Sequence, residues 1–246
     1  MKAIKAVIQA GGKGTRLRPY TTVLPKPLMP IGSKSVLELL LNWLRRNNVR
    51  DVYITTGYLS SLIQAICGDG SQWDLRIKYT HEPEPLGTIG ALSLMREELD
   101  TTFFVINGDV VTDLNLSSLL GFHRHQGSLL TIATTARTTR LDYGVIEDTS
   151  GRVNGFKEKP TFSHNVSMGV YCMEPEVLPF IPSSVAFGLD NLVHCMLARE
   201  AMVATYLHHG SWLDVGRVED FNRAQELAFD EQTPAFETIT PLVASV

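Results

Sequence analysis

Apolar and polar residues follow one another along the chain in short blocks that predict strands and helices in regular alternation. An apolar strand over residues 4–10 precedes a loop rich in Gly, Pro and Thr that ends near Gly32. Ser35 and Glu38 form a capping-box pattern that opens a helix, with apolar residues at 36, 37, 40, 41 and 44. Further strands are predicted over 52–56, 77–80, 103–106 and 129–135, and further helices over 58–66, 88–99 and 116–126. This order predicts an α/β fold in which a Rossmann-like, mostly parallel sheet is flanked by helices.

The pattern changes after residue 140, where shorter strands are joined by turns. Strands are predicted there over 143–147, 153–157 and 166–173, which indicates an inserted, smaller sheet region in the second half. A helix over 189–200, a strand over 202–207 and a helix over 218–228 follow. We therefore predict one domain over residues 1–228 and a C-terminal tail over 229–246, where no helical period is visible.

The composition is that of a globular protein, with 44% hydrophobic and 20% charged residues. It excludes intrinsic disorder, and no apolar run approaches the roughly 18 residues that a membrane helix needs. The first residues contain no apolar signal core. We therefore expect a cytoplasmic protein with no membrane partner.

Charge is distributed unevenly along the chain. The net charge of −4 argues against nucleic acid as a partner. Residues 1–37 nevertheless contain seven basic and no acidic residues, whereas the other 209 carry 15 basic and 26 acidic ones. This contrast indicates an anionic small ligand near the N-terminus, although a solvated basic face would explain the charge alone equally well.

Cysteine and histidine do not form a metal or disulfide pattern. Cys67, Cys172 and Cys195 are widely spaced, which is typical of isolated small buried side chains. The seven histidines show no spacing that would place two rings on one helix face, so we interpret them as surface or loop residues.

The densest group of functional residues is the glycine-rich loop 11–21, directly after the first strand. Glycines at a strand end let backbone N–H groups approach phosphate oxygens. The loop is not a Walker P-loop, because no Lys follows the last Gly of the required spacing, and it departs from the dinucleotide fingerprint at Leu17. The planar fork of Arg16 matches phosphate oxygens, and Lys26 is held between two prolines.

Together with Pro25–Leu28, this loop resembles the signature of the sugar-1-phosphate nucleotidyltransferases, which join a nucleoside triphosphate to a sugar 1-phosphate and release pyrophosphate. The resemblance covers about residues 1–228 and is closest to the mannose- and heptose-1-phosphate guanylyltransferases. The other motifs that carry it are Pro85–Thr88, Asn107–Asp109, Tyr143–Glu147, Glu158–Pro160 and Trp212–Gly216.

The resemblance implies a role for each residue that matches a family motif. The catalytic cations would be Arg16, Lys26 and Lys159. Nucleotide contacts would come from Gln9, Ala10, Gly11, Gly12, Gly14, Thr15, Glu82, Gly87 and Thr88. Sugar-phosphate contacts would come from Asn107, Gly108, Gly144, Glu158, Ser167 and Gly169. Asp109 and Asp214 would bind Mg²⁺, with Mn²⁺ as a substitute, and both follow apolar strands, where carboxylates reach the ligand crevice of an α/β sheet.

Two positions depart from the family pattern. This chain has Ser167 and Met168 before Gly169, where the family often has Asn-Ala, so the sugar contact differs. Gln9 stands where the family usually has Leu; it would either touch the base or face a polar neighbour.

Glu82 occupies the position that resembles the base-reading residue of the family. An ionised carboxylate only accepts hydrogen bonds, which suits the two adjacent donors of guanine and repels the carbonyl oxygens of uracil or thymine. We therefore predict GTP over UTP and dTTP. The alternative is a solvent-facing Glu82, with the base contacted by backbone alone and broad selectivity.

These features predict Mg²⁺-assisted, in-line attack by a sugar 1-phosphate on the α-phosphorus of a nucleoside triphosphate, with no covalent intermediate. The partners would be these two substrates, and a homo-oligomer is compatible with the sequence. The alternatives are a uridylyl- or thymidylyltransferase of the same family, or a catalytically silent regulatory subunit that binds nucleotide sugar. The catalytic cations and both acids are present, which favours the enzyme.

Overall fold

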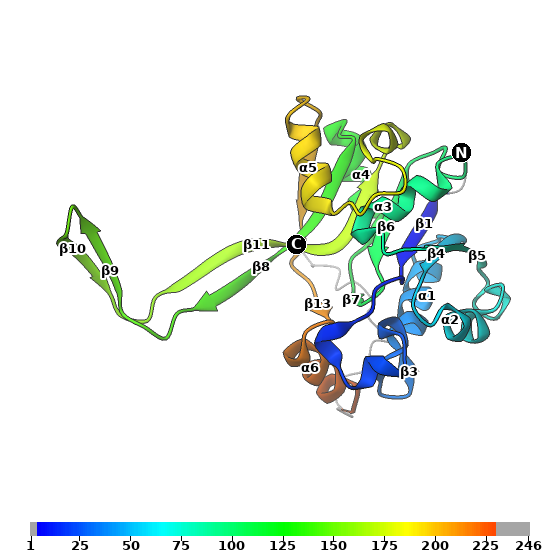
Figure 1. The fold of residues 1–246 in the computed structure, drawn as a ribbon, viewed down its shortest axis with the longest axis horizontal. Coiled ribbons are helices and arrows are strands. Elements are labelled where there is room, and N and C mark those ends of the chain that lie inside the picture. The colour runs from blue at the N-terminus through cyan, green and yellow to red at the C-terminus, as the bar shows by residue number, and fades with distance from the viewer. Residues whose placement is uncertain (1–3, 230–246) are drawn as a thin grey trace, which may run out of the picture.

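A seven-stranded sheet forms the centre of the computed structural model, which describes residues 4–229 (Figure 1). Its strand order is β12-β8-β11-β6-β1-β4-β5. These strands are β1 (Lys5–Gln9), β4 (Asp51–Thr56), β5 (Arg76–His81), β6 (Phe103–Asn107), β8 (Leu130–Arg140), β11 (Thr161–Met173) and β12 (Val203–Leu207). All neighbouring pairs in it are parallel except those of β11, which runs antiparallel to β6 and β8. The mostly parallel α/β fold expected from the sequence is confirmed.

Shorter elements surround the sheet. The helices are α1 (Val36–Arg46), α2 (Ser60–Cys67), α3 (Gly87–Gly90), α4 (Leu116–Gln126), α5 (Leu189–Leu197) and α6 (Val218–Phe229). Short 3₁₀ turns span Thr15–Leu17, Tyr20–Thr22, Lys26–Leu28, Ser71–Trp73, Ala91–Met95 and Pro175–Phe180. Three two-stranded pairs are formed by β2 (Pro30–Ile31) with β3 (Lys34–Ser35), β7 (Val110–Thr112) with β13 (Trp212–Asp214), and β9 (Val145–Thr149) with β10 (Arg152–Lys157). No helix in residues 4–229 is long and apolar enough to cross a bilayer.

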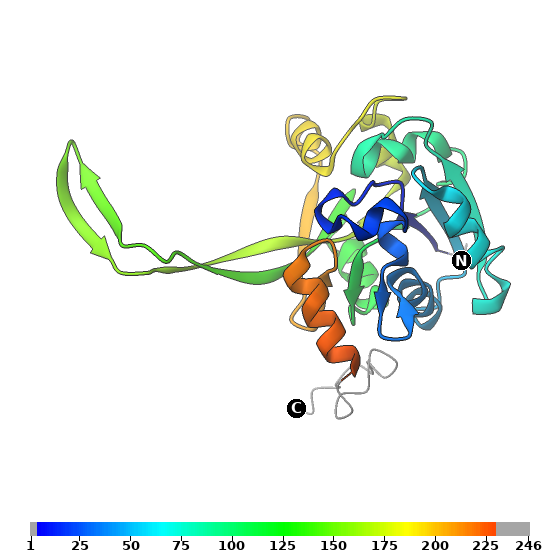
Figure 2. The same cartoon turned by 60° about the horizontal axis from the view of Figure 1, so that its bottom comes forward.

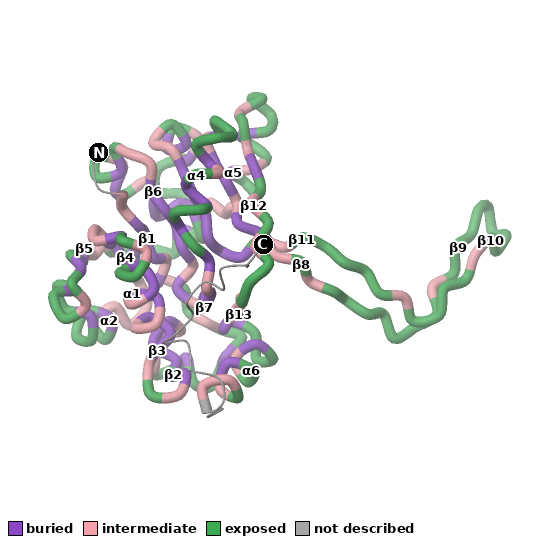
Figure 3. Tube along the Cα trace, turned by 180° about the vertical axis from the view of Figure 1, so that it is seen from behind, coloured by how far each residue is buried: buried purple, intermediate pink, exposed green. Residues whose placement is uncertain are grey.

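Alternate residues of the central strands enter two separate cores, one on each face of the sheet. On β6, Phe104 and Ile106 pack with apolar residues of α1, α2 and α4. Phe103 and Val105 point the other way, toward α5 and the turn Ala91–Met95. Buried backbone accordingly fills the body of the molecule in Figure 3. Both faces are covered, as expected for a mostly parallel sheet.

Helix α1 begins with the capping box that the sequence predicts. The Ser35 hydroxyl accepts a hydrogen bond from the Glu38 N–H at 3.3 Å, and the Glu38 carboxylate accepts from the Ser35 N–H at 2.7 Å. The helix buries its apolar stripe and packs against the turn Lys26–Leu28 and against β7. It therefore supports two segments that carry predicted site residues.

The predicted helix 88–99 is wrong in length. It is divided between α3 and the 3₁₀ turn Ala91–Met95. The carbonyl of Phe187 accepts hydrogen bonds from the N–H groups of both Ile89 and Gly90, at 2.9 and 3.0 Å. A side chain at Gly90 would meet the Val185 carbonyl at 2.7 Å, so a distant loop fixes this short helix.

Residues 135–167 form a long, narrow arm that leaves the body of the molecule (Figures 1 and 2). β8 and β11 are longer than the predicted strands 129–135 and 166–173, and their outer halves pair with each other beyond the sheet. β9 and β10 form the hairpin at the tip. The inserted sheet region predicted from the sequence is therefore this arm. The predicted tail, 229–246, lies outside the described residues apart from the last residue of α6.

Candidate active site

A pocket of about 350 Å³ opens at the carboxyl ends of β1 and β6, the edge where α/β sheets bind ligands. Most of the residues predicted from the sequence line it together: Gln9, Ala10, Gly11, Gly12, Gly14, Thr15, Arg16, Lys26, Glu82, Gly87, Thr88, Asn107, Gly108 and Asp109. Pro27, Pro85 and Gly216 also line it. Sequence reasoning assigned these three no role, although each lies inside one of the motifs used for the resemblance.

The glycine-rich loop is closed by a hydrogen bond within itself and packs closely against Lys26. Gly14 has a φ of 60°, and a side chain there would lie 2.9 Å from the Thr21 methyl and 3.0 Å from Lys26 Cβ. The Thr21 hydroxyl donates to the Gly14 carbonyl at 2.8 Å. Leu17 is buried while Arg16 is exposed at the pocket, so the turn presents the guanidinium without burying it.

Two carboxylates and one ammonium group meet beside this loop. β7 and β13 pair so that Val110 faces Asp214, and the Val215 N–H donates to the Asp109 carbonyl at 2.9 Å. The Lys26 ammonium forms an ion pair with the Asp109 carboxylate. A side chain at Gly216 would overlap Lys26 Nζ and would lie 2.8 Å from an Asp214 oxygen. Lys26, Asp109 and Asp214 therefore form one cluster, although Asp214 is not part of the pocket lining itself.

The positive side chains of this cluster do not fully balance the negative charge of its two carboxylates. Burial raises the pKa of Asp214, and the nearby charge of Asp109 raises it further, while Lys26 and Arg16 offset only part of the shift. Paired carboxylates are hard oxygen ligands of the kind that Mg²⁺ prefers. Among residues 4–229, no group of three or more His, Cys, Asp or Glu side chains could hold a metal ion. The two acids thus fit Mg²⁺ only when other oxygens complete its coordination.

Two amide side chains at the pocket have unsatisfied polar atoms. Gln9 and Asn107 are register partners at the ends of β1 and β6. Both polar atoms of the Gln9 amide, and Asn107 Oδ1, are buried without a hydrogen-bond partner among the described residues. Leaving such an atom unpaired costs about 1–3 kcal/mol. Because both side chains line the pocket, a polar ligand there would satisfy them.

Gly108 and Gly169 allow the close packing behind these amides. A side chain at Gly108 would lie 2.6 Å from the Gln9 carbonyl, to which the Gly108 N–H donates at 2.9 Å. Gly169 has a φ of 73°, and a side chain there would lie 2.7 Å from Asn107 Nδ2. The Ser167 hydroxyl accepts from the Gly169 N–H and donates to Tyr171, each at 3.3 Å. Gly169 and Ser167 therefore lie directly behind the pocket, at the root of the arm.

Glu82 closes one side of the pocket. Its side chain is buried, at 8% exposure, which excludes the alternative that it faces solvent. One carboxylate oxygen accepts from the Leu86 N–H at 3.0 Å, and the other points at Gly11, where any side chain would overlap it. A fixed, acceptor-only group therefore lies beside the glycine-rich loop.

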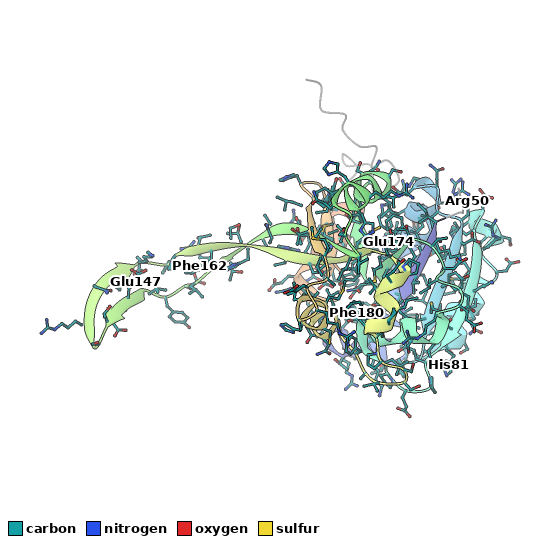
Figure 4. All side chains as sticks on the ribbon, turned by 90° about the horizontal axis from the view of Figure 1, so that it is seen from above. Arg50, His81, Glu147, Phe162, Glu174 and Phe180 are labelled. Carbon is teal, nitrogen blue, oxygen red and sulfur yellow. The ribbon has the colours of Figure 1, made fainter. Side chains whose placement is uncertain are left out.

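The remaining predicted residues lie away from the pocket. Gly144, Glu158 and Lys159 are on the arm, where a side chain at Gly144 would meet the Phe156 ring at 2.5 Å and Glu158 at 3.3 Å. None of the three lines the pocket of its own chain. In Figure 4 the arm side chains, Glu147 and Phe162 among them, project into solvent well clear of the body. The sugar-phosphate roles implied for these residues stay predictions.

Comparison with known proteins agrees with this geometry: the chain belongs to the nucleotidyl transferase family, whose model matches residues 5–231. A mannose-1-phosphate guanyltransferase beta-B of Xenopus laevis is 35% identical over 89% of this chain, and a UTP--glucose-1-phosphate uridylyltransferase of Synechocystis is 33% identical over 90%. The chain spans 62% of the length of each of these relatives. The structure of a putative glucose-1-phosphate thymidylyltransferase from Bacillus anthracis shares the fold, with a TM-score of 0.75, 23% identity and coverage of 93% of this chain and 96% of that one.

Proposed function

We propose that this chain transfers a nucleotidyl group from a nucleoside triphosphate to a sugar 1-phosphate and releases pyrophosphate. The observation that carries the proposal is the meeting of the glycine-rich loop, Arg16 and Lys26 with Asp109 and Asp214 at the carboxyl edge of the sheet. The named activities of the Xenopus and Synechocystis relatives support the same reaction class.

The residues suggest a mechanism of positioning and charge stabilisation. A phosphate oxygen is already an anion at neutral pH, so the attack on the α-phosphorus needs no general base. The backbone of the glycine-rich loop would hold the triphosphate, and Arg16 would stabilise the charge that develops on the departing pyrophosphate. The Lys26 ammonium, held by Asp109, would stabilise charge near the α-phosphate. In-line orientation of two bound reactants then supplies the remaining rate enhancement.

We further propose that Asp109 and Asp214 hold Mg²⁺ together with phosphate oxygens of the substrate. The raised pKa of Asp214 supports this assignment, because a divalent cation would relieve the repulsion between the two carboxylates. When bound, the ion supplies Lewis-acid polarisation of the phosphate oxygens.

We propose GTP as the preferred nucleotide. The fixed carboxylate of Glu82 keeps an acceptor toward the pocket, which suits the two adjacent donors of guanine and disfavours a pyrimidine imide edge. The relatives include both a guanyltransferase and a uridylyltransferase, so the support for guanine comes from the chemistry of Glu82.

The test is pyrophosphate release by the purified chain, measured across a matrix of five nucleoside triphosphates and several sugar 1-phosphates. We expect release with at least one pair, the highest kcat/KM with GTP, and loss of release in Arg16→Ala. Tight binding of a nucleotide sugar without pyrophosphate release from any pair would contradict the proposal and support a silent regulatory subunit.

A further inference from the structure

The arm is a two-stranded ribbon with no core of its own. Within residues 135–167, which the structure describes throughout, no residue is buried. Large apolar side chains on it are exposed: Leu141, Tyr143, Ile146, Val153, Phe156 and Phe162. An isolated two-stranded hairpin is at best marginally stable in water, so these side chains need a surface to pack against.

The root of the arm is fixed to the body. Strands β8 and β11 pair on both sides of the bulge at residues 167–171, so the arm continues two strands of the central sheet. Arg137 bonds the Asp220 carboxylate of α6 at 2.7 Å and stacks over the Trp212 ring at 4.8 Å. The Trp212 indole donates to the Met168 carbonyl at 2.8 Å. These contacts hold the root of the arm against β13 and α6 and fix the direction in which it leaves the body.

The bend in the arm holds a preassembled group of side chains. Gly144, Phe156 and Glu158 lie against one another where the outer hairpin meets the inner ribbon. Lys159, next along the chain, is exposed and has a φ of 45°, a left-handed conformation that costs a non-glycine residue about 1–2 kcal/mol.

Exposed apolar residues also lie close in sequence to residues that line the pocket. Tyr20 and Val23 lie in the loop between Arg16 and Lys26, with exposures of 62% and 73%. Val218 is exposed at the start of α6, two residues after the pocket residue Gly216. The arm itself contains five basic and four acidic residues, so it lacks the strong positive charge of a nucleic-acid-binding element and suits a protein surface.

We propose that two copies of this chain exchange arms, so that the bend of one arm lies over the pocket of the other copy. Lys159 and Glu158 of one chain then complete the partner's site, and the arm's apolar side chains pack against the partner's pocket rim. The symmetry is closed, because each copy gives one arm and receives one. The inference rests on the proposed function for the role of Lys159, but the arm exchange itself does not depend on it.

Heterodimers built from two differently tagged chains test the exchange. The first pairs an Arg16→Ala chain with a Lys159→Ala chain; we expect each variant alone to be inactive, and this heterodimer to recover about half of the wild-type activity, because one of its two sites is intact. The second pairs a wild-type chain with a chain that carries both substitutions; exchange leaves it without an intact site, so we expect almost no activity. A site built within one chain gives the reverse pattern, which would overturn the proposal.

Two measurements that do not require turnover separate this inference from the proposed function. Sedimentation should show a dimer for the wild type and a monomer for Phe156→Ser. Leu197→Ser is the matched control, since Leu197 is exposed by 58% on α5, outside both arm and pocket, and it should remain dimeric. A monomeric wild type, or a Phe156→Ser variant that stays dimeric, would overturn the exchange.

The second measurement uses a photo-reactive label on Thr161→Cys, an exposed arm position near the bend, in a Cys195→Ser background, since Cys195 is the exposed cysteine among residues 4–229. In dimers that combine a ¹⁴N chain with a ¹⁵N chain, we expect the label on the arm of one chain to cross-link to the other chain. The cross-linked peptides should come from the glycine-rich loop or α6 of that other chain. Cross-linked peptide pairs that always carry the same isotope, as expected for contacts within one chain, would overturn the proposal. An arm-dependent dimer with cross-links between chains, but no pyrophosphate release, would contradict only the proposed function.

Discussion

The Asp220 carboxylate joins the root of the arm to the strand that carries Asp214. The same oxygen accepts from the Arg137 guanidinium at 2.7 Å and from the Asp214 N–H at 3.2 Å. Asp220 is 5% exposed, so water does not replace these contacts. Any displacement of the arm root is therefore transmitted through one side chain to a proposed metal ligand.

Replacing Asp220 should consequently affect both stability and turnover. In Asp220→Ala the Asp214 N–H loses its acceptor, and we expect a loss of about 1–3 kcal/mol of unfolding free energy. We also expect a fall in kcat, because Asp214 is no longer held. Urea unfolding and steady-state kinetics measure the two effects. Glu219→Ala, an exposed neighbour on the same helix, should change neither, and equal effects of the two substitutions would contradict the link.

Removing the guanidinium of Arg16 should abolish turnover while the fold is kept. Its side chain is exposed and the turn is anchored by buried Leu17, so Arg16→Ala should leave the melting temperature unchanged. Loss of one such charge-stabilising donor costs about 10²–10³-fold in kcat. Arg18→Ala is the matched control, because Arg18 is exposed in the same loop but does not line the pocket. Near-native pyrophosphate release by Arg16→Ala would show that the triphosphate role is wrong.

Much of the site could be predicted because its residues lie in short, local motifs. The glycine-rich loop follows β1, Glu82 follows β5 and Asn107 ends β6, and the carboxyl ends of these parallel strands meet at one edge of the sheet. Local spacing therefore indicated the glycine-rich loop and Asp109, whereas Glu82 and Asn107 were assigned through the resemblance. The partnership of Asp109 with Asp214 was visible only through the resemblance, since the strands β7 and β13 that join them are three residues long.

The length of the arm and its projection from the body could not be predicted, because the length of β8 and β11 depends on their pairing and not on alternation of apolar residues. β8 continues through a run rich in threonine, whose branched side chain favours a strand without marking a buried face. Its course beyond residue 135 is set by pairing with β11 and by the Arg137 contacts. Gly144, Glu158 and Lys159 match their family motifs in sequence. Local patterns nevertheless do not reveal that they lie on the arm, away from the pocket of their own chain.

Removal of divalent metal should stop the reaction. With excess chelator we expect no pyrophosphate release, and restoration on addition of Mg²⁺ or Mn²⁺. Asp109→Asn and Asp214→Asn should each reduce turnover to background, because a neutral amide oxygen is a weaker ligand than a carboxylate for a hard cation. Asp190→Asn on the exposed surface of α5 is the control and should retain full activity. Undiminished turnover in chelator would rule out the two-carboxylate site.

Replacing Asp214 by asparagine should make the metal-free chain more stable, although the same substitution stops turnover. Burial and the charge of Asp109 raise the pKa of Asp214 above its ordinary value of 3.8. A carboxyl with a raised folded-state pKa favours the fold below the unfolded-state pKa, and this contribution is lost as pH rises through the folded-state pKa. Metal-free Asp214→Asn should therefore melt above the wild type at pH 7, with a difference that shrinks as pH falls through the raised pKa of Asp214 and disappears below pH 3.8.

Calorimetry of both proteins across this pH range, without metal or nucleotide, provides the measurement. The Gly216 N–H that bonds Asp214 at 2.9 Å can still bond an asparagine oxygen, so the substitution removes charge and keeps the contact. Acid unfolding from other groups, such as Asp51 and Asp113 with their lowered pKa values, affects both proteins equally and cancels in the difference. A lower melting temperature for Asp214→Asn at pH 7 would refute the repulsion argument.

Changing Glu82 to Gln should alter the choice of nucleotide. The Leu86 N–H bonds one oxygen of Glu82 at 3.0 Å, and in the variant the amide oxygen can take this bond, leaving an NH₂ donor toward Gly11 and the pocket. A donor at that position opposes the N–H groups of guanine and favours the carbonyl oxygens of uracil and thymine. Since a two-bond base contact is worth about 1–3 kcal/mol, we expect kcat/KM for GTP to fall about 10–100-fold. Values for UTP and dTTP should rise or stay constant. Glu84→Gln, exposed two residues away and outside the main pocket, should leave the order of nucleotides unchanged. A wild-type preference for a pyrimidine nucleotide, or a Glu82→Gln variant with the wild-type order, would show that this carboxylate does not contact the base.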